Sequence, residues 1–154
     1  MSFRPKAIFM FQNEISKLNL KQLKNNEKRW VGTLAGSSAA LLLKEISADS
    51  DRLLVLVARN NQHLGQLENE LEFYGIKPTL FPDWEILPYD RLSPHQDIVS
   101  ERLAILSNMP KTGILLLSST TLVQRVAPIS WVLGEHFDIK VGQKFDLEQQ
   151  KMRL

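Results

Sequence analysis

The sequence predicts an α/β fold in which a parallel sheet carries helices on both faces. Two short runs of branched apolar residues, 52–58 and 113–118, are typical of strands that are buried on both sides. Stretches with helical spacing of apolar residues alternate with these runs. Alternating helices and buried strands imply right-handed crossovers between parallel strands.

The composition fits one globular domain with a core of its own. The chain has 154 residues, of which 44% are apolar and 23% charged, and it has no cysteine. Disulfides, thiolate metal sites and a cysteine nucleophile are therefore excluded. No run of about 18 apolar residues occurs, so no membrane span is expected. The first 20 residues lack the pattern of a secretory signal, and we expect a cytoplasmic protein.

Positive charge is concentrated at the N-terminus. Residues 1–30 carry a net charge of +5, whereas the remaining residues carry −3. We interpret residues 1–29 as a basic, solvated helical arm, because no aromatic or arginine stripe accompanies the lysines. We expect weak, salt-sensitive DNA binding at most.

The first half of the domain reads as helix, strand, helix and strand. Gly36 precedes a helical stretch at 37–47, and the apolar run 52–58 follows. Asn60 and Asn61 offer an N-cap for a helix that carries apolar residues from 64 to 74 and ends at Gly75. Residues 79–81 form a second short strand.

The second half begins with a long loop, 82–97, that holds three prolines. We expect Asp97 to cap a helix at 98–109, and the run 113–118 to form the third strand. Thr121 and Gln124 have the spacing of a capping box that opens a short helix ending before Pro128.

The last residues are assigned to a different unit. Residues 136–141 alternate between polar and apolar, as a half-exposed strand does, and an amphipathic helix begins at 146. We therefore place one domain at 30–135 and the truncated start of a following domain at 136–154.

The glycine-led helix start is the first candidate site. A Walker A loop cradles phosphates with backbone N–H groups and needs a Lys and a Ser/Thr at fixed positions. Those two positions fall on Ser38 and Ala39 or on Ala39 and Ala40, and the nearest lysine, Lys44, lies more than a turn further on. We expect a plain strand–turn–helix joint there and no ATP hydrolysis.

The long loop is the second candidate site. Its carboxylates and histidine match no metal-ligand spacing, so we expect no metal. We expect it to be ordered along the carboxyl ends of the strands, with Trp84 and Tyr89 at least partly buried, as a cap over a disused site or a docking edge. Arg91 and Arg102 are the expected partners for Asp83, Asp90 or Glu101. The candidate residues of this loop are Asp83, Trp84, Tyr89, Asp90, Arg91, His95 and Asp97.

A family resemblance rests on these residues. The segment 80–103, LFPDWEILPYDRLSPHQDIVSERL, closely resembles the N-terminal region of bacterial transcription-repair coupling factors. Blocks around Gly36, 53–58, 113–117, 121–125 and 141–144 agree in order, so the resemblance covers about residues 30–154. The layout is more distantly similar to the first domain of the repair helicase UvrB.

The resemblance implies a three-layer, RecA-like (P-loop NTPase-like) domain 1a of a UvrB-like module that has lost its nucleotide site. The degenerate loop would be Gly36, Ser37, Ser38, Ala39 and Ala40. This chain would bind no cofactor, whereas motor domains elsewhere in the parent would use ATP and Mg²⁺. The parent would displace stalled RNA polymerase from DNA and recruit UvrA for nucleotide excision repair. An active nucleotide-dependent helicase domain, or a free-standing nucleotide-binding domain, are the alternatives.

Overall fold

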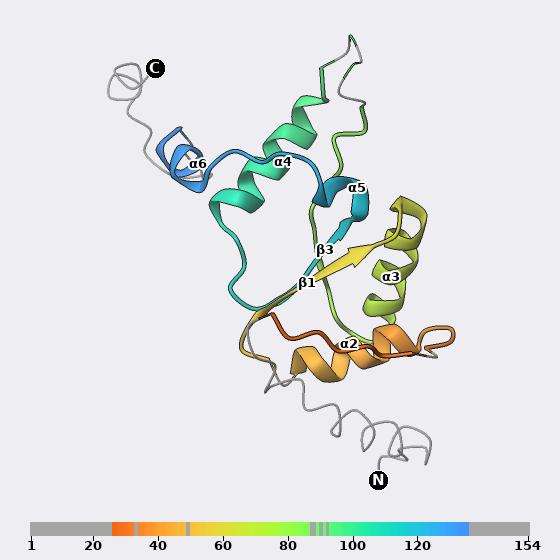
Figure 1. Cartoon of the computed structure of the whole chain (residues 1–154). Coiled ribbons are helices and arrows are strands. Elements are labelled where there is room, and N and C mark those ends of the chain that lie inside the picture. Colours follow the sequence, from red (N-terminus) through yellow and green to blue (C-terminus); the bar gives the residue numbers. More distant parts are fainter. Residues whose placement is uncertain are drawn as a thin grey trace.

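The computed structural model is built on a three-stranded parallel sheet with β3 (Gly113–Ser118) at its centre (Figure 1). Strand β1 (Leu53–Ala58) pairs along the whole of β3, and β2 (Thr79–Leu80) pairs on its other edge. The structure describes residues 26–32, 34–48, 50–86, 89, 91 and 93–135. All of β3 after Gly113 is buried, because the strand has neighbours on both edges and helices on both faces. The predicted parallel α/β fold is confirmed.

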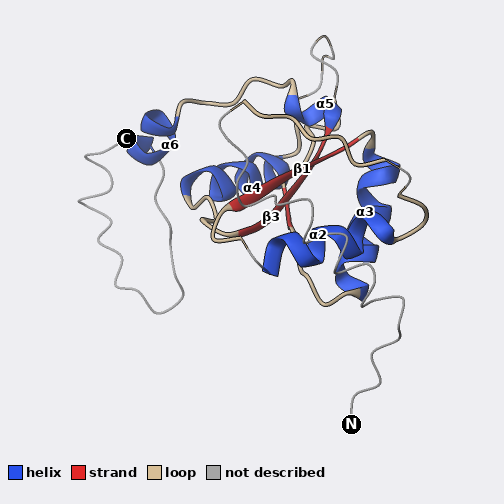
Figure 2. Cartoon of the chain, turned by 60° about the horizontal axis from the view of Figure 1, so that its bottom comes forward, coloured by secondary structure: helices blue, strands red, loops and turns tan. Residues whose placement is uncertain are grey.

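One face of the sheet is covered by α2 (Ser38–Ala48) and α3 (Asn61–Phe73) (Figure 2). Ala40 of α2 and Leu71 of α3 meet Ile114 of β3 in one apolar cluster. Leu67 of α3 packs on Leu116 in a second. Burial of these side chains fixes both helices against the sheet.

The opposite face is covered by α4 (Gln96–Ser107). Ile105 and Leu106 of this helix pack against Phe81, Leu115 and Leu117. Even-numbered residues of β3 thus face α2 and α3, and odd-numbered residues face α4, as the period of a strand requires.

The short helix α6 (Ile129–Glu135) packs beside α4 and buries Val132 (Figures 1 and 2). The sequence did not predict this helix. Trp131 and Val132 donate their backbone N–H groups to the carbonyl of Pro128. Proline at a helix start costs little, because the N–H that it lacks would have no partner there.

Helix α3 begins and ends as predicted. The Asn60 side chain accepts the N–H of His63 at 2.8 Å and forms the N-cap. Gly75 follows the helix with φ +79°, a left-handed conformation that favours glycine, and Ile76 N–H bonds the carbonyl of Leu71.

Two predicted caps are wrong. The N-cap of α4 is His95, whose Nδ1 accepts the N–H of Asp97 at 3.3 Å, so Asp97 lies inside the first turn. The short helix α5 (Ser119–Leu122) is capped by Ser118, whose hydroxyl accepts the N–H of Thr121. Because β3 runs directly into α5, its last residue takes the cap position, and Thr121 and Gln124 are free for other contacts.

The turn before α2 contains Gly36 at φ +56°, but no strand precedes it among residues 26–32 and 34–35. The predicted strand–turn–helix joint is therefore only a turn and a helix in this part of the chain. The arm up to residue 25, the strand 136–141 and the helix from 146 lie outside the described residues.

Leu71 and Phe73 provide a test of this packing within one helix. Leu71 is fully buried, whereas Phe73 is 83% exposed. We expect Leu71→Ala to lower the free energy of unfolding by about 3 kcal/mol. Phe73→Ala should change it by about 0.5 kcal/mol or less. Chemical denaturation measures both, and equal effects would contradict the described orientation of α3.

Candidate functional site

A polar cluster lies at the carboxyl end of β3, around the carboxylate of Asp83. Its Oδ2 accepts hydrogen bonds from Thr120 Oγ1 at 2.6 Å and Thr121 Oγ1 at 3.2 Å. Its Oδ1 accepts from Gln124 Nε2 at 2.8 Å. The Asp83 cluster, as we call it below, consists of Asp83, Arg102, Ser118, Thr120, Thr121 and Gln124.

Arg102 of α4 is the buried cation of the Asp83 cluster, with only 2% of its surface exposed. Its Nη1 donates to the carbonyl of Pro82 and, at 3.0 Å, to Gln124 Oε1. The guanidinium carbon lies 4.5 Å from the centre of the Phe81 ring and 4.0 Å from that of Trp84. These rings provide cation–π contacts in place of water.

Gln124 connects the two charges, because its amide nitrogen donates to Asp83 and its amide oxygen accepts from Arg102. Burial raises the pKa of Asp83, but hydrogen bonds from Thr120, Gln124, the Glu85 N–H and Thr121 outweigh it, and the pKa falls to about 2. Burial lowers the pKa of Arg102, and the negative charge of Asp83 opposes that shift. Both groups are charged at neutral pH.

The Asp83 cluster is built to hold three segments together. A carboxylate with so low a pKa is a poor general base at neutral pH. The hydroxyls of Thr120 and Thr121 already donate to Asp83. The cluster therefore ties the residues after β2 to α4 and to the β3–α5 junction.

The long loop 82–97 is anchored at its base and exposed further along. Trp84 is partly buried against Arg102, as predicted, but Tyr89 is 96% exposed, so the prediction that it is buried is wrong. Anchoring by Phe81, Trp84 and Asp83 already fixes the base of the loop. Asp90 lies outside the described residues, and Arg91 is exposed.

His95 and Asp97 lie next to each other at the start of α4. His95 Nδ1 is 3.2 Å from an Asp97 carboxylate oxygen, and both side chains are largely exposed. Arg102 is beside Asp83, as expected, but it reaches that carboxylate through Gln124. Among the described residues, no three His, Asp or Glu side chains gather as a metal site would need. The absence of a bound metal stays a prediction.

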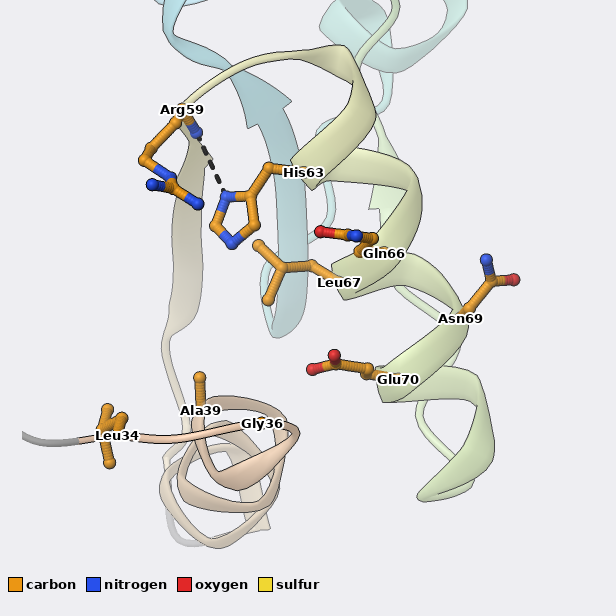
Figure 3. Close-up of a pocket in the computed structure, with 9 residues that line it drawn as sticks. All are labelled: Leu34, Gly36, Ala39, Arg59, His63, Gln66, Leu67, Asn69 and Glu70. Atoms are coloured by element: carbon orange, nitrogen blue, oxygen red, sulfur yellow. Dashed lines mark hydrogen bonds between the residues drawn. The ribbon is translucent and has the colours of Figure 1, made fainter.

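A hollow of about 520 Å³ lies between α3 and the turn before α2, away from the Asp83 cluster (Figure 3). Arg59, His63, Gln66 and Glu70 point into it from one side, and Ala39 lies on the other. His63 Nδ1 accepts the backbone N–H of Arg59 at 3.3 Å. The cavity thus has both a cation and a carboxylate on its wall.

The positions of the degenerate Walker loop are poorly suited to a nucleotide. Ala39 offers only a methyl group to the cavity, and Ala40 is fully buried against Leu71. The Lys44 ammonium lies 5.7 Å from the centre of the Tyr74 ring, and Ser37 Oγ is 3.4 Å from the Tyr74 hydroxyl. Tyr74 therefore engages Lys44 and Ser37, whereas the hydroxyl of Ser38 is buried and has no hydrogen-bond partner among the described residues.

Sequence reasoning expected Arg102 beside Asp83 but missed the burial of Arg102 and the contacts of Thr120, Thr121 and Gln124. Arg102 lies four residues after Ile98 and three before Ile105, so it occupies the apolar face of α4. Four hydroxyl residues, 118–121, follow a buried strand directly. A charged residue on a core-facing position and a run of hydroxyls at a strand end were the available signals.

Comparison with known proteins finds relatives of one kind. The chain is 36% identical over 135 residues to a transcription-repair-coupling factor of Escherichia coli (strain K12), and this match covers 86% of the chain. A protein of that name from Haemophilus influenzae is 35% identical over 134 residues and covers 84%. One from Mycobacterium tuberculosis is 33% identical over 131 residues and covers 79%.

The match takes in only a small part of each relative. The chain spans 12% of the length of the first two proteins and 10% of the third. No family model matches the chain. No helix in the described part of the chain is both long and apolar enough to cross a membrane.

The low pKa of Asp83 predicts a pH dependence of stability. The pKa of about 2 lies below the ordinary 3.8, so the folded state binds this proton more weakly than the unfolded state. The resulting stabilisation is complete above about pH 4 and is lost as the pH falls toward 2. Asp83→Asn should remove this loss of stability in acid. Denaturation midpoints measured between pH 2 and 7 would record the difference.

Thr120 provides the matched pair of variants. Thr120→Val removes the shortest hydrogen bond to the Asp83 carboxylate and should narrow the pH range over which the protein loses stability in acid. Thr120→Ser keeps the hydroxyl and should keep the pH dependence of the wild type. An acid profile shared by the wild type, Asp83→Asn and Thr120→Val would contradict this account.

Proposed function

Because the chain is homologous to a segment of about 135 residues of transcription-repair-coupling factors, we propose that it forms a non-catalytic scaffold module of such a protein. In this proposal the module provides a folded surface for contacts with other parts of the protein or with its partners, and it catalyses no reaction itself. The parallel sheet, the Asp83 cluster and the turn at Gly36 are its structural parts.

The observation that carries this proposal is the position of Ala39 and Ala40. By the resemblance to UvrB-like proteins, a working phosphate loop would have an ammonium and a hydroxyl at these positions. Here one position presents a methyl group and the other is packed in the apolar core. Without a lysine, a main source of stabilisation for a transferring phosphoryl group is missing.

The finer assignment of the fold belongs to the same proposal. We assign the domain to the RecA-like class and to domain 1a of a UvrB-like module, with a degenerate nucleotide site. The three parallel strands and the helices on both faces are consistent with that class. The left-handed glycine turn before α2, with Gly36 at φ +56°, also supports this assignment.

The activity of the whole protein lies, in this proposal, in other domains. Those domains hydrolyse ATP with Mg²⁺, move along DNA, displace stalled RNA polymerase and recruit UvrA for nucleotide excision repair. The chain matches only 12% of such a protein, which leaves room for them.

The exposed part of the loop 82–97 is a docking edge in this proposal. Tyr89 and Arg91 are exposed beyond a base that Trp84 and Asp83 hold. An exposed tyrosine beside an arginine is a combination that protein interfaces favour.

Calorimetry with ATP and Mg²⁺ tests the scaffold role against the alternative of an active nucleotide-dependent domain. We expect no heat of binding at millimolar nucleotide and no phosphate release, because the lysine and the hydroxyl are missing. A dissociation constant in the micromolar range would contradict the proposal.

A variant of the cavity wall makes this test sharper. If weak binding appears, Arg59→Ala identifies its place, because Arg59 is the cation that lines the cavity. Loss of binding in Arg59→Ala would assign a nucleotide to this hollow and favour the alternative. Binding that Arg59→Ala leaves unchanged lies outside the hollow and agrees with a degenerate site.

A further inference from the structure

Glu85, at the base of the loop 82–97, has a backbone conformation that its residue type disfavours. Of the described residues after 26, it is the one non-glycine residue with a positive φ, which is +58°. A side chain is strained in this left-handed region, which glycine occupies freely and asparagine or aspartate more readily than glutamate. Gly75 and Gly113 occupy positive-φ positions elsewhere in the chain. The turn at residue 85 therefore favours glycine, and a glutamate there strains the loop base.

The side chain of Glu85 gives nothing back to the fold within the described part of the chain. Its backbone N–H donates to Asp83 Oδ1 at 3.4 Å, a bond that any residue except proline could make in such a turn. No hydrogen bond or ion pair joins its carboxylate to another described residue. From Phe81 to Ile86 it is the one exposed residue, while its neighbours on both sides are at least partly buried.

The backbone that carries Glu85 is firmly held. Trp84, directly before it, lies with its ring 4.0 Å from the guanidinium carbon of the buried Arg102. Asp83, one residue earlier, accepts the amide nitrogen of Gln124 at 2.8 Å. The Glu85 carboxylate is thus exposed on an anchored turn, so that the backbone loses little conformational freedom when a partner binds it.

The charge at this edge fits a cationic partner. The negative charge of Asp83 is matched inside the protein by Arg102, whereas Glu85 has no such match among the described residues. The other exposed charged side chains of the loop and of the first two turns of α4, as far as the structure describes them, are Arg91, His95, Asp97 and Glu101. Three carboxylates against one arginine repel the phosphates of a nucleic acid. They attract a protein segment that carries lysine or arginine.

Tyr89 adds an aromatic ring to the same loop. Its side chain is 96% exposed, although a tyrosine ring is largely apolar. Such a ring can pack on an apolar residue of a partner, while Glu85 pairs with a cation next to that residue. Carboxylates pair well with arginine in particular, because its guanidinium can donate two parallel hydrogen bonds.

We propose that Glu85 is a recognition residue, which binds an arginine or lysine side chain of a partner protein while Tyr89 packs on an apolar residue beside that cation. The proposal rests on the proposed function only in taking the loop 82–97 as a docking edge. The strained backbone is then retained because glycine and asparagine, which suit the turn better, supply no carboxylate.

Stability measurements separate a recognition residue from a structural one. Glu85→Gly relieves the strained backbone and should raise the folding equilibrium constant by about threefold. Glu85→Gln keeps the strained backbone and should leave this constant within about twofold of the wild type. Chemical denaturation measures both variants. A tenfold fall in the folding equilibrium constant of either variant would show that the glutamate side chain is structural and would overturn the proposal.

A peptide probe tests recognition directly. The probe is a hexapeptide of alternating leucine and arginine with blocked ends, and fluorescence anisotropy measures its binding to the chain at low salt. We expect a dissociation constant of about 1 mM or below, and Glu85→Gln should weaken binding by about fivefold. Glu72→Gln, the same substitution at an exposed position of α3, should change the affinity by less than about twofold. A peptide with glutamate in place of arginine should not bind.

Two further results would overturn the proposal. One is the absence of measurable binding of the arginine peptide to the wild type. The other is an affinity for this peptide that Glu85→Gln lowers no more than Glu72→Gln does, which would assign the binding to general charge attraction. Calorimetry with ATP on the same samples tests the proposed function separately. A silent titration without peptide binding would leave the scaffold role standing and remove only the role of Glu85.

Discussion

The buried guanidinium of Arg102 and the carboxylate of Asp83, joined through Gln124, are the interaction on which the carboxyl edge of this sheet depends. Arg102 belongs to α4, Asp83 follows β2, and Gln124 follows α5, so one network holds three segments that are distant in sequence. Burial of an arginine is costly unless its hydrogen bonds and charge are matched. Here the Pro82 carbonyl, Gln124, two aromatic rings and the charge of Asp83 provide most of the match, and Arg102 Nη2 is buried without a hydrogen-bond partner among the described residues.

The two candidate sites are poorly suited to chemistry for different reasons. At the loop base, charged groups are present but are committed to one another, and the pKa of Asp83 is too low for proton transfer at neutral pH. At the turn before α2, a hollow is present, but Ala39 and Ala40 bring neither charge nor hydroxyl to it. Both features agree with the scaffold module that we propose.

The local features of this fold could be predicted from the sequence, whereas most of its long-range contacts could not. The runs 53–58 and 113–118 are strands because branched apolar residues fit a strand buried on both faces, and Asn60 and Gly75 bound α3 through local geometry. The caps at Asp97 and Thr121 were wrong because His95 and Ser118 took those positions. Arg102 and Gln124 are 22 residues apart, and their contact depends on how α4 packs, which no local pattern encodes.

Arg102 and Asp83 act as one coupled unit, and a double-mutant cycle measures this coupling most directly. Chemical denaturation of Arg102→Met, Asp83→Asn and the double variant gives the three free energies. Arg102→Met alone should lower the free energy of unfolding by about 3 kcal/mol, because Asp83 and Gln124 lose a charged partner. The double variant should cost less than the sum of the single variants by about 1–2 kcal/mol. Additive effects of the two substitutions would contradict the account.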